Sequence, residues 1–186
     1  MNKIATFEKV SFNQFLKGWK DTFPESTEDK IRRIYDSIRL PQRATKGSAG
    51  YDFFAPCDVE LGNSIVRLVN FLHYGRNNIN DYIITIPTGI RCEIENGWVL
   101  QLYPRSGHGF KYGVRLADTV GIIDSDYYDS DNEGHIFVKL VNDSAIEKYM
   151  VIKTGEAFCQ GVFVPFGVTT DDHVEGIRNG GFGSTG

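Results

Sequence analysis

The first forty residues carry a helical pattern of apolar positions. Apolar side chains recur at i, i+3, i+4 and i+7, which is one face of an amphipathic helix: Phe12, Phe15, Leu16 and Trp19. Pro24 interrupts this pattern, and Ser26 or Thr27 then stands where it can cap a second helix. The apolar stripe of that second helix consists of Ile31, Ile34, Tyr35 and Ile38. The pattern therefore predicts a helical N-terminal appendage over residues 1–37.

From about residue 38 onward, the pattern changes to short strands. Runs rich in Val, Ile, Phe and Tyr are separated by Gly, Pro, Asn and Asp, and no helices alternate with them. The predicted strands are 82–86, 97–104, 135–142, 149–153 and 157–166. Many short strands between turn signals are typical of an antiparallel β barrel or sandwich. Residues 64–75 have apolar positions on both periods, so a short helix and a hairpin strand stay open there.

Composition and charge narrow the class of protein. The length of 186 residues suits one domain with a small appendage. The net charge of −4 disfavours a protein that grips nucleic acid by its phosphates, because that needs a basic face. No apolar run is long enough for a membrane span or for a secretory signal. Three cysteines without a CxxC pair fit a reducing, cytoplasmic location.

Two internal segments have the chemistry of a site. Arg105, Ser106 and Gly107 open a glycine-containing turn after a predicted strand, where a guanidinium, a hydroxyl and backbone N–H groups can hold a phosphate. The alternative is a polar surface turn. Five acidic residues fall within 124–133, which fits a solvated loop, a calcium loop or a catalytic carboxylate. A calcium loop would need Glu where Leu140 stands. Asp124 ends an apolar run, so it can act as a base at the edge of the core.

The C-terminal residues 176–186 form the third candidate. This segment holds five of the 20 glycines, two hydroxyl side chains, Arg178 and a single aromatic residue, Phe182. Such a composition suits a mobile flap that stacks on a base and wraps phosphates, whereas the alternative is a disordered terminus. The segment is not a Walker A motif, and the four histidines lack metal-ligand spacing.

Taken in order, five segments resemble the motifs of the homotrimeric dUTPase family. They are AGYDFFAP (49–56), PRSG (104–107), GIIDSDYY (121–128), GEAFCQG (155–161) and RNGGFGSTG (178–186). The resemblance implies an all-β fold, a jelly-roll-like barrel assembled as a homotrimer whose active sites are shared between subunits. The chain would then divide into the helical appendage 1–37, a barrel over 38–175 with an insertion at 64–82, and the flap 176–186.

The resemblance also implies an activity and a set of site residues. The activity is hydrolysis of dUTP to dUMP and diphosphate with Mg²⁺, with Asp124 as the general base for water that attacks the α-phosphate. Tyr127 would pack on the deoxyribose and exclude a 2′-hydroxyl. Asp52 would support the water shell of the metal or the Arg105 side chain. Arg105, Ser106, Gly107 and Gln160 would contact the phosphates, and a hairpin with Asp118, Ile122, Ile123 and Phe137 would recognise uracil. Phe182 would stack on the base, and Arg178, Gly183, Ser184 and Thr185 would close over the phosphates.

Four departures from the family pattern and two rival functions accompany this interpretation. Asp118 replaces a frequent Asn, residues 129–133 lengthen the hairpin, Ala157 replaces an Arg, and Arg178 lies two residues before GGFG instead of three. One rival is a regulatory or interaction protein on the same fold, with 1–40 or 64–82 binding a partner. The other is a dCTP deaminase, which is disfavoured because Lys139 stands where that family has its catalytic Glu.

Overall fold

The computed structural model describes residues 2–62, 82–144, 149–176, 178 and 180. Nearly all of the predicted insertion at 64–82 lies outside these residues, and so does most of the C-terminal segment. In chain order, the elements are β1 (Ala5–Lys9), α1 (Phe12–Thr22), α2 (Glu28–Ser37), β2 (Gln42–Arg43), β3 (Tyr51–Phe54), β4 (Val59–Leu61), β5 (Ile83–Pro87), β6 (Ile90–Ile94), β7 (Trp98–Pro104), α4 (Ser106–Tyr112), β8 (Val114–Leu116), β9 (Gly121–Ile123), the 3₁₀ helix η2 (Ser125–Asp129), β10 (Phe137–Asn142), β11 (Met150–Ile152) and β12 (Ala157–Pro165).

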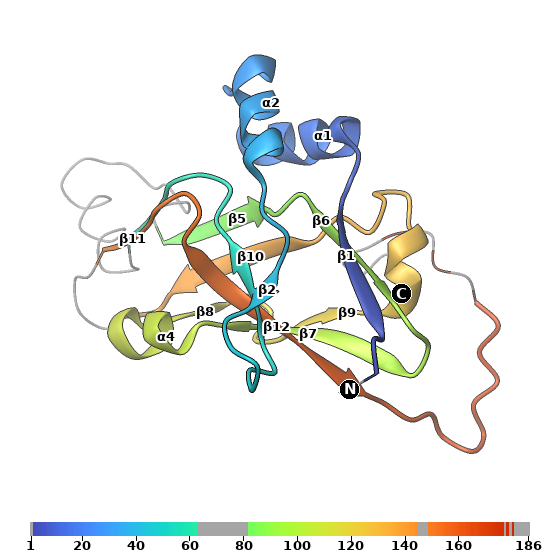
Figure 1. Ribbon diagram of the computed structural model, residues 1–186. Helices are drawn as coiled ribbons and strands as arrows, with labels where there is room; N and C mark the ends of the chain where they lie inside the picture. The colour runs from blue at the N-terminus through green and yellow to red at the C-terminus, as the bar shows by residue number, and fades with distance from the viewer. Residues whose placement is uncertain (1, 63–81, 145–148, 177, 179, 181–186) are drawn as a thin grey trace.

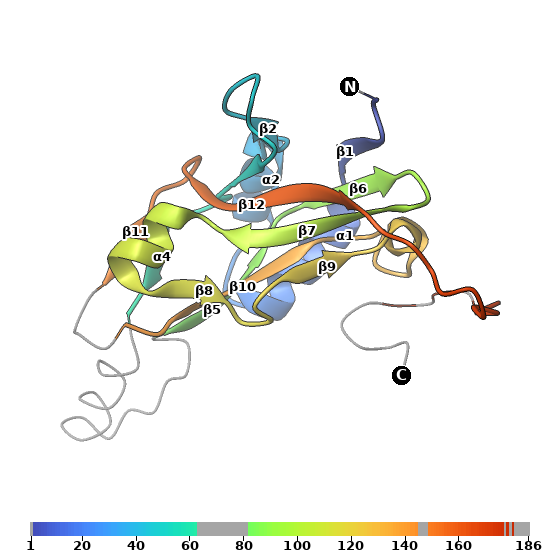
Figure 2. The ribbon, with the colours of Figure 1, turned by 90° about the horizontal axis from the view of Figure 1, so that it is seen from below.

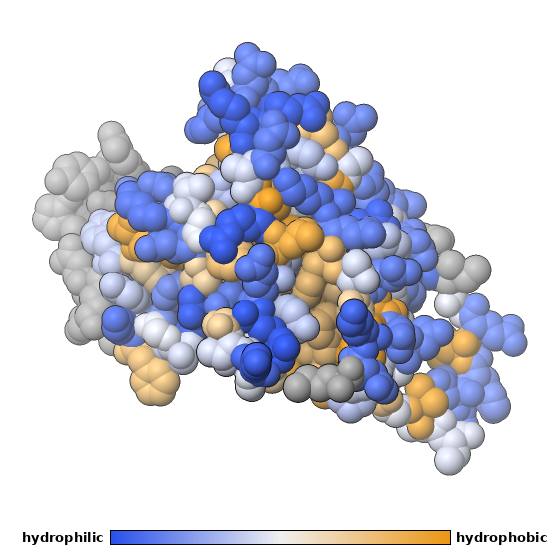
Figure 3. Space-filling view, viewed as in Figure 1, coloured by the Kyte–Doolittle hydropathy of each residue, from blue (hydrophilic) through white to orange (hydrophobic). Residues whose placement is uncertain are grey.

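The two predicted N-terminal helices are present, and both have capping residues. The Ser11 hydroxyl caps α1 by accepting a hydrogen bond from the backbone N–H of Gln14 (3.2 Å). Thr27 caps α2 in the same way, which settles the choice between Ser26 and Thr27. Phe15 and Trp19 of α1, Ile31 of α2 and Val10, which precedes α1, form a small core of their own. The helices lie together on one side of the strands, and the space-filling view shows α2 hydrophilic on its outer side (Figures 1 and 3).

A strand, β1, precedes the two N-terminal helices, and the sequence pattern did not predict it. Residues 5–9, which fall inside the predicted helical appendage, form β1 and pair antiparallel with β6. The register runs from Ala5 opposite Ile94 to Lys9 opposite Ile90. Five residues give too little periodicity to identify a strand, and the partner that orders them lies far along the chain.

Antiparallel strands make up most of the regular secondary structure in the described residues, as predicted. The largest sheet has the order β2-β3-β12-β7-β9, and the others are β5-β10-β8, β1-β6 and β4-β11. Within the described residues these sheets do not join into one closed barrel. Their inner faces share a main core whose largest fully buried members include Phe53, Leu100, Leu102, Leu140 and Phe158. No helix in the described part of the chain is long and apolar enough to cross a membrane.

Candidate active site

Strand β7 separates the candidate residues into two groups. Arg105 follows the last residue of β7, Pro104. At the other end, β9 pairs with β7 so that Ile123 lies opposite Leu100, and Asp124 follows at the level of Val99. The six residue steps from Val99 to Arg105 correspond to about 20 Å of extended strand. Figure 2 shows the same separation, with α4 at one end of β7 and β9 leading away toward the other.

The first group lies where β3, β12 and β7 run side by side. Gln160 on β12 pairs in register with Asp52 on β3 and with Tyr103 on β7. Its side-chain Nε2 donates to the Pro104 carbonyl (3.4 Å), and Asp52 Oδ1 lies 3.6 Å from Arg105 Nε. The fold therefore brings three of the predicted segments together. Two roles were expected for Asp52, and the ion pair with Arg105 corresponds to one of them.

Ser106 and Gly107 begin a helix rather than the predicted turn. Arg105 is the N-cap residue of α4, which contains both of them and ends at Gly113 in the left-handed conformation (φ 65°). The first N–H groups of a helix have no acceptor within the helix. The backbone N–H groups of Ser106 and Gly107 therefore have no acceptor within α4 and directly follow Arg105 in the chain, a combination of donors that suits an anion.

The second group surrounds Asp124, which directly precedes η2. Its side chain is 44% exposed, and its Oδ2 is 2.5 Å from Arg178 Nη2. The Nε of the same guanidinium donates to Asp126 Oδ1 (2.9 Å). The Arg178 guanidinium carbon also lies 5.7 Å from the centre of the Tyr127 ring. Residue 178 thus reaches the predicted base and its neighbours within one chain.

Tyr127 is held rigidly at this end of the sheet. Its side chain is buried (5% exposed), and its hydroxyl donates to the His135 carbonyl (2.8 Å) while accepting from Asn132 Nδ2 (2.8 Å). Burial raises the pKa of the Tyr127 hydroxyl, so the group is protonated at neutral pH. Because the hydroxyl already has a donor and an acceptor, the ring is what Tyr127 can offer to a ligand. His135 and Asn132 were missed by sequence analysis, which had no local signal for them.

Comparison with known proteins identifies the family of the chain. The family model described as dUTPase matches residues 78–186. The chain belongs to the dUTPase family. This dUTPase-family chain is 39% identical over 152 residues to the deoxyuridine 5'-triphosphate nucleotidohydrolase of Lactococcus lactis, a match that covers 80% of the chain and 89% of the relative. It is 36% identical to the enzyme of the same name from Desulfitobacterium hafniense (strain Y51), over 80% and 87% of the two chains.

Solved dUTPase structures have the same fold. The dUTPase from Streptococcus mutans superposes with a TM-score of 0.56 at 28% identity, covering 88% of this chain and 97% of its own. The dUTPase from phage phi11 of S. aureus gives a TM-score of 0.57 at 20% identity, over 95% and 99%. At that identity the phage protein supports the fold alone.

The hairpin expected to read the base borders a pocket in this dUTPase-family protein. Asp118 and Phe137 line a cavity of about 740 Å³ together with Lys139 and Thr85. Of the other two hairpin candidates, Ile122 on β9 is 53% exposed and Ile123 is half-buried. The remaining candidates, Phe182, Gly183, Ser184 and Thr185, lie outside the described residues.

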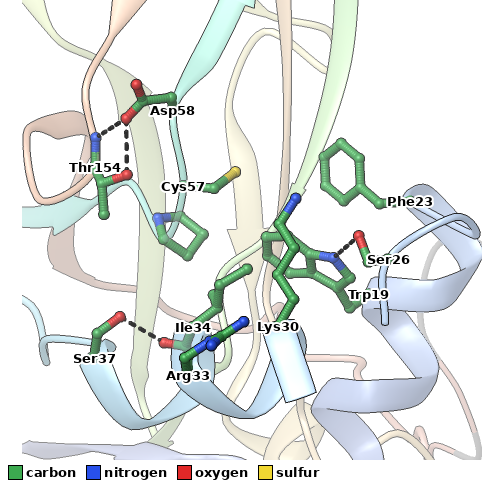
Figure 4. Close-up of a pocket in the computed structure, with 11 residues that line it drawn as sticks. Trp19, Phe23, Ser26, Lys30, Arg33, Ile34, Ser37, Cys57, Asp58 and Thr154 are labelled. Carbon is green, nitrogen blue, oxygen red and sulfur yellow. Dashed lines mark hydrogen bonds between the residues drawn. The ribbon is translucent and has the colours of Figure 1, made fainter. Parts of the chain in front are cut away.

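A second pocket lies apart from all of these candidates. It is a cavity of about 500 Å³ between the two N-terminal helices and the loop after β3 (Figure 4). Trp19, Lys30, Arg33 and Cys57 are among its lining residues. Burial raises the pKa of the Cys57 thiol to about 11, so this cysteine is not a nucleophile at neutral pH.

Proposed function

We propose that this dUTPase-family protein hydrolyses dUTP to dUMP and diphosphate by attack of water on the α-phosphate, with Asp124 as the general base. The hydrolysis of dUTP follows from the family and from the curated relatives named above. The observation that carries the assigned role is the position of Asp124. Its carboxylate stands at the end of β9, anchored by the sheet behind it yet 44% exposed, so a water molecule can reach it.

The phosphate chain is assigned to the first group. Arg105 supplies a guanidinium held by Asp52, the first turn of α4 supplies N–H groups of Ser106 and Gly107, and Gln160 supplies an amide. A triphosphate carries about four negative charges. Charge-assisted hydrogen bonds from fixed donors bind such charges more strongly than hydrogen bonds between neutral groups do. Fixed donors also stabilise charge that develops during attack without rearranging.

The nucleoside is assigned to the second group. The Tyr127 ring is assigned to the deoxyribose, where it would exclude a 2′-hydroxyl, because the two hydrogen bonds of its hydroxyl hold the ring in place. The hairpin from Asp118 to Phe137 is assigned to uracil. Attraction alone separates substrates that differ by one methyl group by only about 1–3 kcal/mol, so thymine has to be rejected by steric exclusion.

The separation of the two groups supports a shared active site. A triphosphate chain is too short to connect Asp124 with Arg105 along about 20 Å of β7 in one protomer. In a homotrimer of jelly-roll-like subunits, the Asp124 end of one subunit would face the Arg105 end of the next, and the segment 176–186 would close over the nucleotide.

Mg²⁺ fits this site as a partner of the substrate rather than as an ion in a protein cage. Within the described ranges, no three His, Cys, Asp or Glu side chains gather where they could hold a metal. Mg²⁺ commonly binds through one or two carboxylates together with substrate phosphates. Asp52, at the phosphate end, is the carboxylate that would contact its water shell. When bound, the ion would neutralise phosphate charge.

The test replaces Asp124 and compares a neighbour. Asp124→Asn should still bind dUTP but release diphosphate about 10²–10⁴-fold more slowly, which is the usual contribution of a general base. Asp126→Asn is the matched control, because Asp126 binds the same Arg178 and loses the same charge. It should keep turnover within about tenfold of the native protein. Residual turnover above a tenth of the native rate in Asp124→Asn would remove Asp124 from its assigned role.

A further inference from the structure

Helix α1 is attached to the segment that follows Tyr127, and its first anchor is Glu133. The backbone N–H and the hydroxyl of Ser11, the N-cap residue of α1, each donate to the Glu133 carboxylate (2.6 Å for both). A carboxylate at a helix N-terminus also interacts favourably with the helix dipole. Glu133 has φ of 58°, a left-handed conformation that a residue with a side chain adopts at a cost. The lengthened hairpin thus ends in a strained residue that binds α1.

The second anchor lies in the middle of the helix, at Gly18. A Cβ at this position would lie 2.7 Å from Phe137 Cζ and 3.1 Å from Cε1 and Nδ1 of His135. The helix backbone therefore rests directly on the two aromatic rings, which contact each other in a tilted arrangement with centroids 4.2 Å apart and an interplanar angle of 42°. His135 is completely buried, and its Nε2 accepts from the Gly89 N–H (2.9 Å). The imidazole is fixed from both sides.

These two anchors lead to the residues assigned to the nucleoside. The carbonyl of His135 accepts the Tyr127 hydroxyl hydrogen bond, so a shift of residue 135 moves the acceptor that fixes the Tyr127 ring. Phe137 lines the same cavity as Asp118, and the end of α1 forms another wall of that cavity through Thr22 and Phe23. Helix α1 therefore borders both the sugar side and the base side of the second group.

We propose that α1 is a positioning element of the nucleoside subsite, in which Gly18 and the Ser11–Glu133 contact set the places of His135, Phe137 and Tyr127. This inference rests on the proposed function, since Tyr127 and Phe137 meet a nucleoside only if that assignment holds. A helix that merely covers apolar surface would change the amount of folded protein when altered. A positioning helix changes how well the folded protein binds the nucleoside.

Gly18→Ala is the first test, made in the full-length chain. The added methyl group meets Phe137 and His135, while alanine itself favours the helix relative to glycine. We expect KM for dUTP to rise about fivefold or more with kcat within about twofold, and the preference of kcat/KM for dUTP over UTP to fall by a similar factor. An unchanged KM and an unchanged dUTP preference, with only kcat or yield reduced, would overturn the inference.

A double variant identifies the contact responsible. Phe137→Leu removes the ring atom that the new methyl group would meet. In that background Gly18→Ala should raise KM by a smaller factor than it does alone, because the contact with the Phe137 ring is gone and only the 3.1 Å contacts with His135 remain. Additive effects would mean that Gly18 does not act through Phe137 and would contradict this part of the proposal.

A second pair of variants tests the other anchor and does not depend on Gly18→Ala folding. Glu133→Gln removes the charge that holds Ser11 but keeps the size of the side chain. Asp131→Asn is the control, since Asp131 is an exposed carboxylate of the same loop. We expect KM to rise at least about threefold for Glu133→Gln and to stay unchanged for Asp131→Asn. Equal behaviour of the two variants would contradict the anchor.

Binding of the non-hydrolysable α,β-imido analogue of dUTP, measured by calorimetry, keeps this inference separate from the proposed hydrolysis. The Kd for the analogue should rise with KM in Gly18→Ala and Glu133→Gln. An unchanged Kd would overturn the role of α1 whether or not the protein turns over dUTP. Absence of turnover in the native protein would contradict the proposed function and leave the Kd comparison valid.

Discussion

His135→Gln removes an imidazole that folding buries completely. In the native protein its Nε2 accepts a hydrogen bond from the Gly89 N–H (2.9 Å), and the amide oxygen of glutamine can accept in a similar place. Burial lowers the pKa of His135 from 6.5 to about 3, because the imidazolium would lose its water without gaining a partner. The variant thus deletes a titrating group while keeping an acceptor for Gly89.

The sign of the effect follows from the lowered pKa. At a pH between the two pKa values, the unfolded chain binds a proton at His135 and the folded chain does not, so protons favour unfolding. The stability is fully present above pH 6.5 and is lost as the pH falls from 6.5 toward 3. At pH 5, which is 1.5 below the unfolded pKa, the loss is about 2 kcal/mol at 1.36 kcal/mol for each pKa unit.

Urea unfolding at pH 7 and at pH 5, at one fixed protein concentration, measures this loss. The native protein should lose about 2 kcal/mol more of its unfolding free energy between these pH values than His135→Gln does. His173→Gln is the control and should follow the native protein, because His173 is exposed. Equal losses for the native protein and His135→Gln would refute the argument that the buried imidazole stays neutral in the folded state.

Two further predictions address the assembly and the substrate. Mixing Asp124→Asn subunits with Arg105→Ala subunits in equal amounts should restore about a quarter of native turnover, because a site that takes one residue from each of two subunits is complete in one of four combinations. If mass spectrometry shows that mixed trimers form and turnover does not recover, both residues belong to the site of the same protomer. The kcat/KM for diphosphate release should be at least about a hundredfold higher for dUTP than for dTTP, dCTP or UTP, which corresponds to a free-energy difference of about 2.7 kcal/mol. Comparable rates for these nucleotides would show that the Asp118–Phe137 hairpin does not select the base.

The sequence predicted the elements whose patterns are long and local. The two N-terminal helices have clear apolar stripes and capping residues, and the longer strands, such as β7 and β12, have strong runs of β-forming residues. Helix α4 was missed because Gly107 and Gly109 weaken helix propensity and resemble a turn. The helix forms in the structure with a left-handed C-cap at Gly113.

The sequence names the candidate site residues but not their arrangement in space. Asp124, Arg105 and Gln160 stand in short local motifs, so sequence resemblance names them directly. Their distribution along β7 depends on strand register, which pairs β9 with one end of β7 and brings β3 and β12 to the other. The role of the segment 129–133 could not be predicted from the sequence either. The sequence indicates only a longer hairpin, whereas the fold uses Glu133 to hold a helix from the other end of the chain.

The contact of Arg178 with Asp124 and Asp126 bears on how the C-terminal segment acts. The Asp124 and Asp126 side chains are 44% and 56% exposed, whereas the Arg178 side chain is 19% exposed. Because solvent reaches the carboxylate side of each pair, we expect each pair to contribute about 1 kcal/mol, as surface ion pairs do. A triphosphate with about four negative charges offers the same guanidinium a stronger, bidentate partner. Arg178 can therefore leave Asp124 at little cost when a nucleotide arrives, which frees the carboxylate to hold water. Under the proposed function, a nucleotide that binds Arg178 would therefore also uncover the Asp124 carboxylate.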